Sequence, residues 1–223
     1  MDLRTRTSLF CGALALAIAV SILLRGRRRR AHLFFAAFAA DIGLWYVTQW
    51  AYHFVRSEVW VRFTAVLAVL LPQFAVHLFE VLVPQREKRS TLIRVSGVLM
   101  IPMMVLVLSP EHKHGLVRGA VMLYVCGLIA ASLWSLALRG GRSRSRATQQ
   151  RVRFLVVVGA LAAAFTLADF LWFVGAPLPP VGAVLSIVFL FLLAESLVRK
   201  RLVDLYDILG QLLVSTALAF CLA

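Results

Sequence analysis

The sequence predicts an all-α, polytopic membrane helix bundle with seven transmembrane helices and a truncated eighth hydrophobic segment. Hydrophobic residues make up 61% of the 223 residues and charged residues only 15%. Soluble domains, by contrast, are about half apolar and about a quarter charged. The apolar residues also form long uninterrupted runs, as membrane spans do. Backbone groups in lipid must bond within their own segment, and no run alternates like a barrel strand, so the spans are predicted to be helices.

Seven runs suit a hydrocarbon core about 30 Å thick, which takes roughly 17–25 residues, and the fourth run is the short one. In chain order the predicted spans are residues 8–24, 33–54, 59–83, 95–108, 119–138, 154–175 and 181–198. The first is followed at once by an arginine run, which resists translocation and favours a span over a cleaved signal peptide. Residues 1–201 therefore form one predicted transmembrane domain.

Basic residues are unevenly divided between alternate connections. One set of loops holds 18 of the 24 Lys and Arg residues: Arg25, Arg27, Arg28, Arg29, Arg30, Arg86, Lys88, Arg89, Arg94, Arg139, Arg142, Arg144, Arg146, Arg151, Arg153, Arg199, Lys200 and Arg201. The positive-inside rule predicts that this set faces the cytoplasm of a bacterial inner membrane and that the N-terminus lies outside. The net charge of +14 is thus assigned to topogenic loops beside the lipid bilayer, and no nucleic-acid partner is predicted.

Four of the ionisable residues inside predicted spans are candidates for function, because charged groups are costly in lipid and usually functional there. Asp41 in the second span and His77 in the third lie at similar depths, so we expect a hydrogen bond between them. Asp169 in the sixth span has a depth close to that of Arg62 in the third, and these two residues could also pair. The four are candidate sensing residues, and the alternative is a structural polar clamp between helices.

Other polar and aromatic residues lie nearer the predicted membrane surfaces. Glu80 and Glu195 are within about a turn of the basic face, and we expect both to reach toward the basic loops. Tryptophan and tyrosine gather near the other face and predict an interfacial belt, with an outward-opening ligand vestibule as the alternative. They are Trp45, Tyr46, Trp50, Tyr52, Trp60 and Trp172.

Two prolines lie in the middle of spans. Pro72 in the third and Pro102 in the fourth each remove one helical hydrogen bond, and each predicts a kink. The two are candidate hinges for signal transmission, and ordinary packing geometry is the alternative.

Enzyme and cofactor signatures are not found. The chain contains no HExxH, no GxSxG and no glycine-rich phosphate loop, so no catalytic residue, metal or cofactor is predicted. A retinal protein needs a lysine inside a span, but Lys88, Lys113 and Lys200 all lie in predicted loops. The three cysteines lie in apolar runs without CxxC spacing and are interpreted as small hydrophobic residues.

Two short stretches resemble one bacterial sensor family. Leu71-Pro72, His77-Leu78-Phe79 and Val83-Pro84 are similar to its LP…HF…FP pattern. The stretch LLAESLVRKRLVD, residues 192–204, resembles its "YAI.RYRL.D" exit, with Ala194-Glu195 where the family more often has Tyr-Ala. The family is the seven-helix N-terminal membrane region of bacterial histidine kinases.

The resemblance implies a signal-input module, followed in such proteins by a cytoplasmic kinase domain that acts with a response regulator. The signal exit would comprise Glu195, Arg199, Lys200, Arg201 and Asp204. We expect such a module to work as a homodimer. The chain itself carries no phosphoacceptor histidine motif and no ATP-binding motif, so it corresponds to the sensor part of a kinase without the catalytic part.

The last segment complicates this exit. Residues 202–223 are predicted to form a turn at the cytoplasmic surface and the start of an incomplete eighth span, since the apolar run from Gln211 is too short to cross a bilayer. The chain is therefore interpreted as a fragment or truncated product. The alternative function is a small transporter or permease that uses Asp41, His77 and Asp169 as a proton or substrate path, although no inverted repeat supports it.

Overall fold

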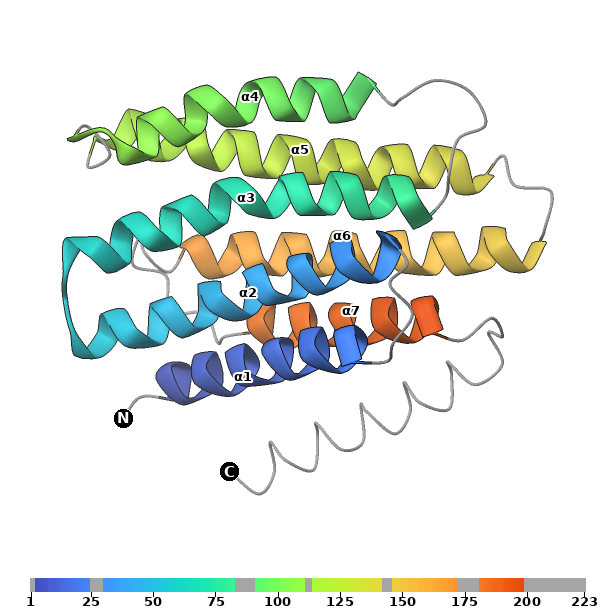
Figure 1. Ribbon diagram of the computed structural model, residues 1–223, viewed down its shortest axis with the longest axis horizontal. Coiled ribbons are helices and arrows are strands. Elements are labelled where there is room, and N and C mark those ends of the chain that lie inside the picture. Colours follow the sequence, from blue (N-terminus) through green and yellow to red (C-terminus); the bar gives the residue numbers. More distant parts are fainter. Residues whose placement is uncertain are drawn as a thin grey trace.

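The computed structural model describes residues 3–24, 30–82, 91–110, 114–141, 146–171 and 181–198. Within these ranges every regular element is a helix, which confirms the predicted all-α fold class. The helices run side by side along the long axis of the molecule (Figure 1). They are α1 (Leu3–Leu24), α2 (Arg30–Phe54), α3 (Glu58–Leu82), α4 (Thr91–Leu108), α5 (Gly115–Gly141), α6 (Arg146–Leu171) and α7 (Val181–Val198).

Five of these helices, α1 to α5, are long and apolar enough to cross a membrane. Shorter apolar helical stretches, Val152–Ala164 and Gly182–Glu195, lie within α6 and α7. The helix α5 extends beyond its predicted span at both ends, from Gly115 to Gly141. Hydropathy detects only the part of a helix suited to lipid, whereas the backbone hydrogen bonds continue into polar flanks.

The helices form a bundle in which neighbours in sequence are mostly neighbours in space. The central helix α3 packs against α2, α4 and α5, while α6 packs against α5 and α7. The chain closes on itself because α7 also contacts α1 and α2. In Figure 1, α4 and α5 lie beyond α3 on one side, and α2 and α1 lie on the other.

The backbones of α1 and α2 approach closely at a pair of glycines. A Cβ atom added at Gly12 would lie 3.1 Å from the Gly43 carbonyl oxygen, and one added at Gly43 would lie 3.1 Å from the Gly12 oxygen. Small residues at such crossings let two backbones approach and gain dispersion contacts, which drive helix association where the surrounding lipid is itself apolar. The two glycines thus fix where α1 crosses α2.

Large apolar side chains lie both inside and outside the bundle. Leu190, Leu192 and Leu193 of α7 are almost fully buried in the main core. On α5, however, Leu116, Leu123 and Trp134 are 88%, 76% and 69% exposed. A surface carrying side chains of this kind is suited to contact with lipid tails.

Basic residues lie near both ends of the described bundle. Helices α2, α4 and α6 begin at the end where α1, α3, α5 and α7 finish (Figure 1). Arg30, Arg94, Arg139 and Arg153 all belong to that end, since they lie in first, second or last turns of their helices. The opposite end carries Arg6, Arg56, Arg62 and Arg118, so the described residues place basic side chains at both ends.

Candidate functional site

One stripe of α2 faces α3. Phe34, Asp41 and Thr48 recur every seventh residue, so they lie on one face of the helix. The outer two both contact α3: Phe34 stacks on His77, and Thr48 Oγ1 accepts a hydrogen bond of 3.1 Å from Thr64 Oγ1. Asp41 lies between them and therefore faces α3 as well.

Asp41 is the most isolated polar residue of this stripe. Its side chain is 4% exposed, and its Oδ2 atom has no hydrogen-bond partner among the described residues. Leaving a buried polar group without a partner is costly, and more so if the group is charged. The burial of the Asp41 carboxyl group without a partner for Oδ2 therefore needs a chemical explanation.

His77 does not lie beside Asp41. Its ring stacks on Phe34 with centroids 5.1 Å apart, and its Nε2 lies 3.3 Å from Gln73 Nε2. Phe34 is seven residues from Asp41, which is two helical turns, or roughly 10 Å along α2. The expected hydrogen bond between Asp41 and His77 is therefore not formed. The two residues do not lie at the same depth: Phe34, two turns before Asp41 on the same face of α2, is the residue level with His77.

A second face of α2 meets α7. The rings of Phe38 and Phe189 pack edge to face with centroids 6.5 Å apart, and Tyr46 Oη donates a hydrogen bond of 3.5 Å to Ser186 Oγ. Tyr46 is only 3% exposed, so assigning it to an interfacial aromatic belt was wrong. Its ring is part of the bundle core, where it joins α2 to the last described helix.

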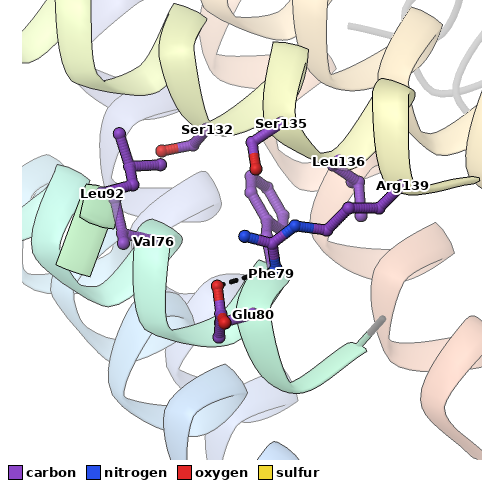
Figure 2. Close-up of a pocket in the computed structure, with 8 residues that line it drawn as sticks. All are labelled: Val76, Phe79, Glu80, Leu92, Ser132, Ser135, Leu136 and Arg139. Atoms are coloured by element: carbon purple, nitrogen blue, oxygen red, sulfur yellow. Dashed lines mark ion pairs between the residues drawn. The ribbon is translucent and has the colours of Figure 1, made fainter. Parts of the chain in front are cut away.

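A small pocket lies near the end of the bundle where α3 and α5 finish, between α3, α4 and α5. Its empty volume is about 180 Å³. An ion pair crosses it, with Arg139 Nη1 2.7 Å from Glu80 Oε2 (Figure 2). Glu80 thus meets a basic residue, as expected from its place at the end of its span. The pocket is lined by Val76, Phe79, Glu80, Leu92, Ser132, Ser135, Leu136 and Arg139.

The other predicted residues are scattered. Arg62 is half-buried near the start of α3, and Glu195 is half-buried near the end of α7. Pro72 is buried inside α3, whereas Pro102 is exposed on α4. The side chains of Asp169 and Trp172, and the exit residues Arg199, Lys200, Arg201 and Asp204, lie outside the described residues, as does the segment 202–223.

Several interface residues were not singled out from the sequence. Threonine and serine are uncharged and common in membrane spans. Hydropathy therefore does not single out Thr48, Thr64 and Ser186 as contact residues. The seven-residue spacing of Phe34, Asp41 and Thr48 was a usable signal, because it places an acid and a hydroxyl on one helix face. No such signal marked Ser186 as the partner of Tyr46.

No protein-family model, curated protein or solved structure matches this chain.

Proposed function

We propose that this chain is the membrane-embedded signal-input region of a bacterial two-component histidine kinase, with seven spans and its N-terminus outside. The observation that carries the proposal is the double role of α2. One face of α2 meets α3 through Phe34 and Thr48, and another meets α7 through Phe38 and Tyr46. A rearrangement at the α2–α3 interface is therefore transmitted to α7, which leads into the proposed exit.

The mechanism is a shift between two packings of the bundle. A stimulus drives such a shift only if it binds the two packings with different affinity. Leu190, Leu192 and Leu193 are almost fully buried, so α7 cannot move without its neighbours repacking. In the proposed assembly, two copies form a dimer in the lipid bilayer, and the movement of α7 changes how a cytoplasmic kinase domain phosphorylates its response regulator.

The reading frame beyond codon 223 gives the first test. We expect it to continue through further membrane sequence into a domain with a phosphoacceptor histidine and an ATP-binding motif. A frame that ends soon after codon 223, with no kinase gene beside it, would contradict the proposal.

Autophosphorylation of the full-length product gives the second test. We expect Phe189→Ala to change the basal rate several-fold at an unchanged level in the membrane, because it removes the ring that packs on Phe38. The matched control is Phe10→Ala, since Phe10 is 64% exposed on α1 and faces away from the core. Equal rates in both variants and the wild type would contradict coupling through α7.

A transporter that uses Asp41, His77 and Asp169 is the second candidate, and the buried carboxyl of Asp41 favours it. The two-turn separation between Asp41 and His77 argues against a continuous path through both residues. Flux across liposomes that is lost in Asp41→Asn would support the transporter over the sensor.

A further inference from the structure

The two contacts that flank Asp41 define what lies opposite it on α3. Phe34 meets His77 and Thr48 meets Thr64, so the two helices run antiparallel in a fixed register. Asp41 is midway between Phe34 and Thr48, and the midpoint of the facing segment is at Leu70 and Leu71. This register places Asp41 against the helical turn that ends at Pro72.

That turn contains a carbonyl group without its usual donor. Proline has no backbone N–H, so Pro72 cannot donate to the carbonyl oxygen of Ala68, four residues earlier. Ala68 follows Thr64 by four residues and therefore lies on the face of α3 that meets α2. In lipid such a carbonyl must be satisfied by a neighbouring helix, a side chain or a water molecule.

The carboxyl group of Asp41 can supply the missing donor only if it carries a proton. An ionised carboxylate accepts hydrogen bonds and donates none, and its charge would be unpaired in a site that is 4% exposed. A protonated carboxyl needs an acceptor for its O–H, which the Ala68 carbonyl offers. Among the described residues no donor reaches Oδ2, whereas a buried ionised carboxylate oxygen would need one.

We propose that Asp41 is a proton-binding site that joins α2 to α3 by donating a hydrogen bond to the Ala68 carbonyl, which Pro72 leaves without a donor. Loss of the proton removes the donor and leaves a negative charge in the interface, which favours a looser packing of the two helices. The claim that the proton is the stimulus of the sensor rests on the proposed function. The claim that Asp41 binds a proton does not.

No described cation is positioned to hold Asp41 in its ionised form. On α3 the nearest ionisable side chains in register are Arg62, two residues before the Thr64 contact, and His77, two turns along from Asp41. On α1 the crossing at Gly12 and Gly43 brings the Cys11 thiol nearest, and on α7 the described ionisable side chain is Glu195, near the helix end. On α2 itself, Tyr46 bonds to Ser186.

Infrared spectroscopy of the chain in lipid at neutral pH tests the protonation directly. In the difference spectrum between wild type and Asp41→Asn, we expect the carbonyl stretching band of one neutral carboxylic acid. The control is Glu80→Gln, which should leave that band in place because Glu80 is ion-paired with Arg139. A difference spectrum with only carboxylate bands would overturn the proposal, whatever the output activity of the kinase.

A double-mutant cycle tests the partner. Pro72→Ala restores a backbone N–H that can bond to the Ala68 carbonyl. In that background the hydrogen bond from Asp41 should no longer stabilise the protein. We expect Asp41→Ala to lower the thermal midpoint about 3 °C more in the wild-type background than in the Pro72→Ala background, the shift that one interhelical hydrogen bond gives. Equal shifts in the two backgrounds would overturn the Ala68 assignment. Asp41→Asn, which keeps an N–H donor, should retain most of the coupling.

Discussion

At the scale of single residues, the Glu80–Arg139 pair is the strongest polar contact described between two helices. Both side chains are largely buried, at 18% and 13% exposure, and their closest atoms are 2.7 Å apart. Removing one member of such a pair leaves the other charge without compensation, which costs more than the pair itself contributes.

We therefore expect Arg139→Gln to lower the free energy of unfolding by about 1–3 kcal/mol. The measurement is thermal unfolding in detergent micelles. Arg118→Gln, an exposed arginine at the opposite end of the same helix, is the control and should change stability by less than about 0.5 kcal/mol. Equal losses in both variants would show that general charge, and not the Glu80 contact, sets the effect.

Two substitutions of Tyr46 separate the stability contributed by its ring from that contributed by its hydroxyl group. Its hydrogen bond to Ser186 is long, at 3.5 Å, but its ring is almost fully buried. We expect Tyr46→Phe to cost at most about 0.6 kcal/mol and Tyr46→Ala about 3–5 kcal/mol. Both values come from unfolding of the same preparation. A larger loss in Tyr46→Phe than in Tyr46→Ala would contradict this division.

The candidate residues and their contacts were not equally predictable. The ionisable side chain of Asp41 in an apolar run was sufficient to single it out, and the structure buries it. Its relation to His77 could not be derived from depth counted along the sequence, because contact depends on the offset of the two helices along their axes and on their crossing point. Those are fixed by packing at distant residues, such as the Gly12–Gly43 crossing, which a single sequence does not specify.

At the scale of elements, hydropathy located the helices well and their ends less well. The seventh predicted span, 181–198, coincides with α7, and the third, 59–83, differs from α3 by one residue at each end. The fifth is seven residues shorter than α5, because polar ends contribute nothing to hydropathy while they still complete helical turns.

The α1–α2 crossing allows a direct test of element packing. We expect Gly43→Val to destabilise the bundle by about 1–3 kcal/mol, since even a Cβ atom there would lie 2.8 Å from Leu16 Cγ and 3.1 Å from the Gly12 oxygen. Gly127→Val is the matched control: no side chain lies within 4 Å of a Cβ at that helical position. Thermal unfolding of the two variants measures the difference, and a similar loss in both would indicate a backbone effect only.

At the scale of the whole molecule, two features bear on how the bundle would lie in a membrane. Exposed apolar side chains occur on each of the helices α1 to α6, and 18 of the 24 Lys and Arg residues belong to one set of connections in the sequence. The first feature suits a lipid environment, and from the second the positive-inside rule predicts which connections face the cytoplasm. Together they predict which residues meet water, which meet lipid, and on which side.

Cysteine labelling in intact cells tests this prediction. In a chain with Cys11, Cys126 and Cys221 replaced by alanine, we expect Val55→Cys to react with a membrane-impermeant maleimide from outside, because Val55 is 58% exposed in the turn between α2 and α3. Thr91→Cys, at the end predicted to face the cytoplasm, should react only after the cells are opened. The reverse pattern would invert the orientation.

Ile101→Cys is the control for an exposed residue that is expected to face lipid. Ile101 is 63% exposed near the middle of α4, so its accessibility in the bundle is as high as that of Val55. If this face lies in lipid, the charged reagent cannot reach it and the thiol cannot ionise, so no labelling is expected before or after the cells are opened. Labelling of Ile101→Cys in opened cells would show that α4 lines water and would contradict the seven-span arrangement.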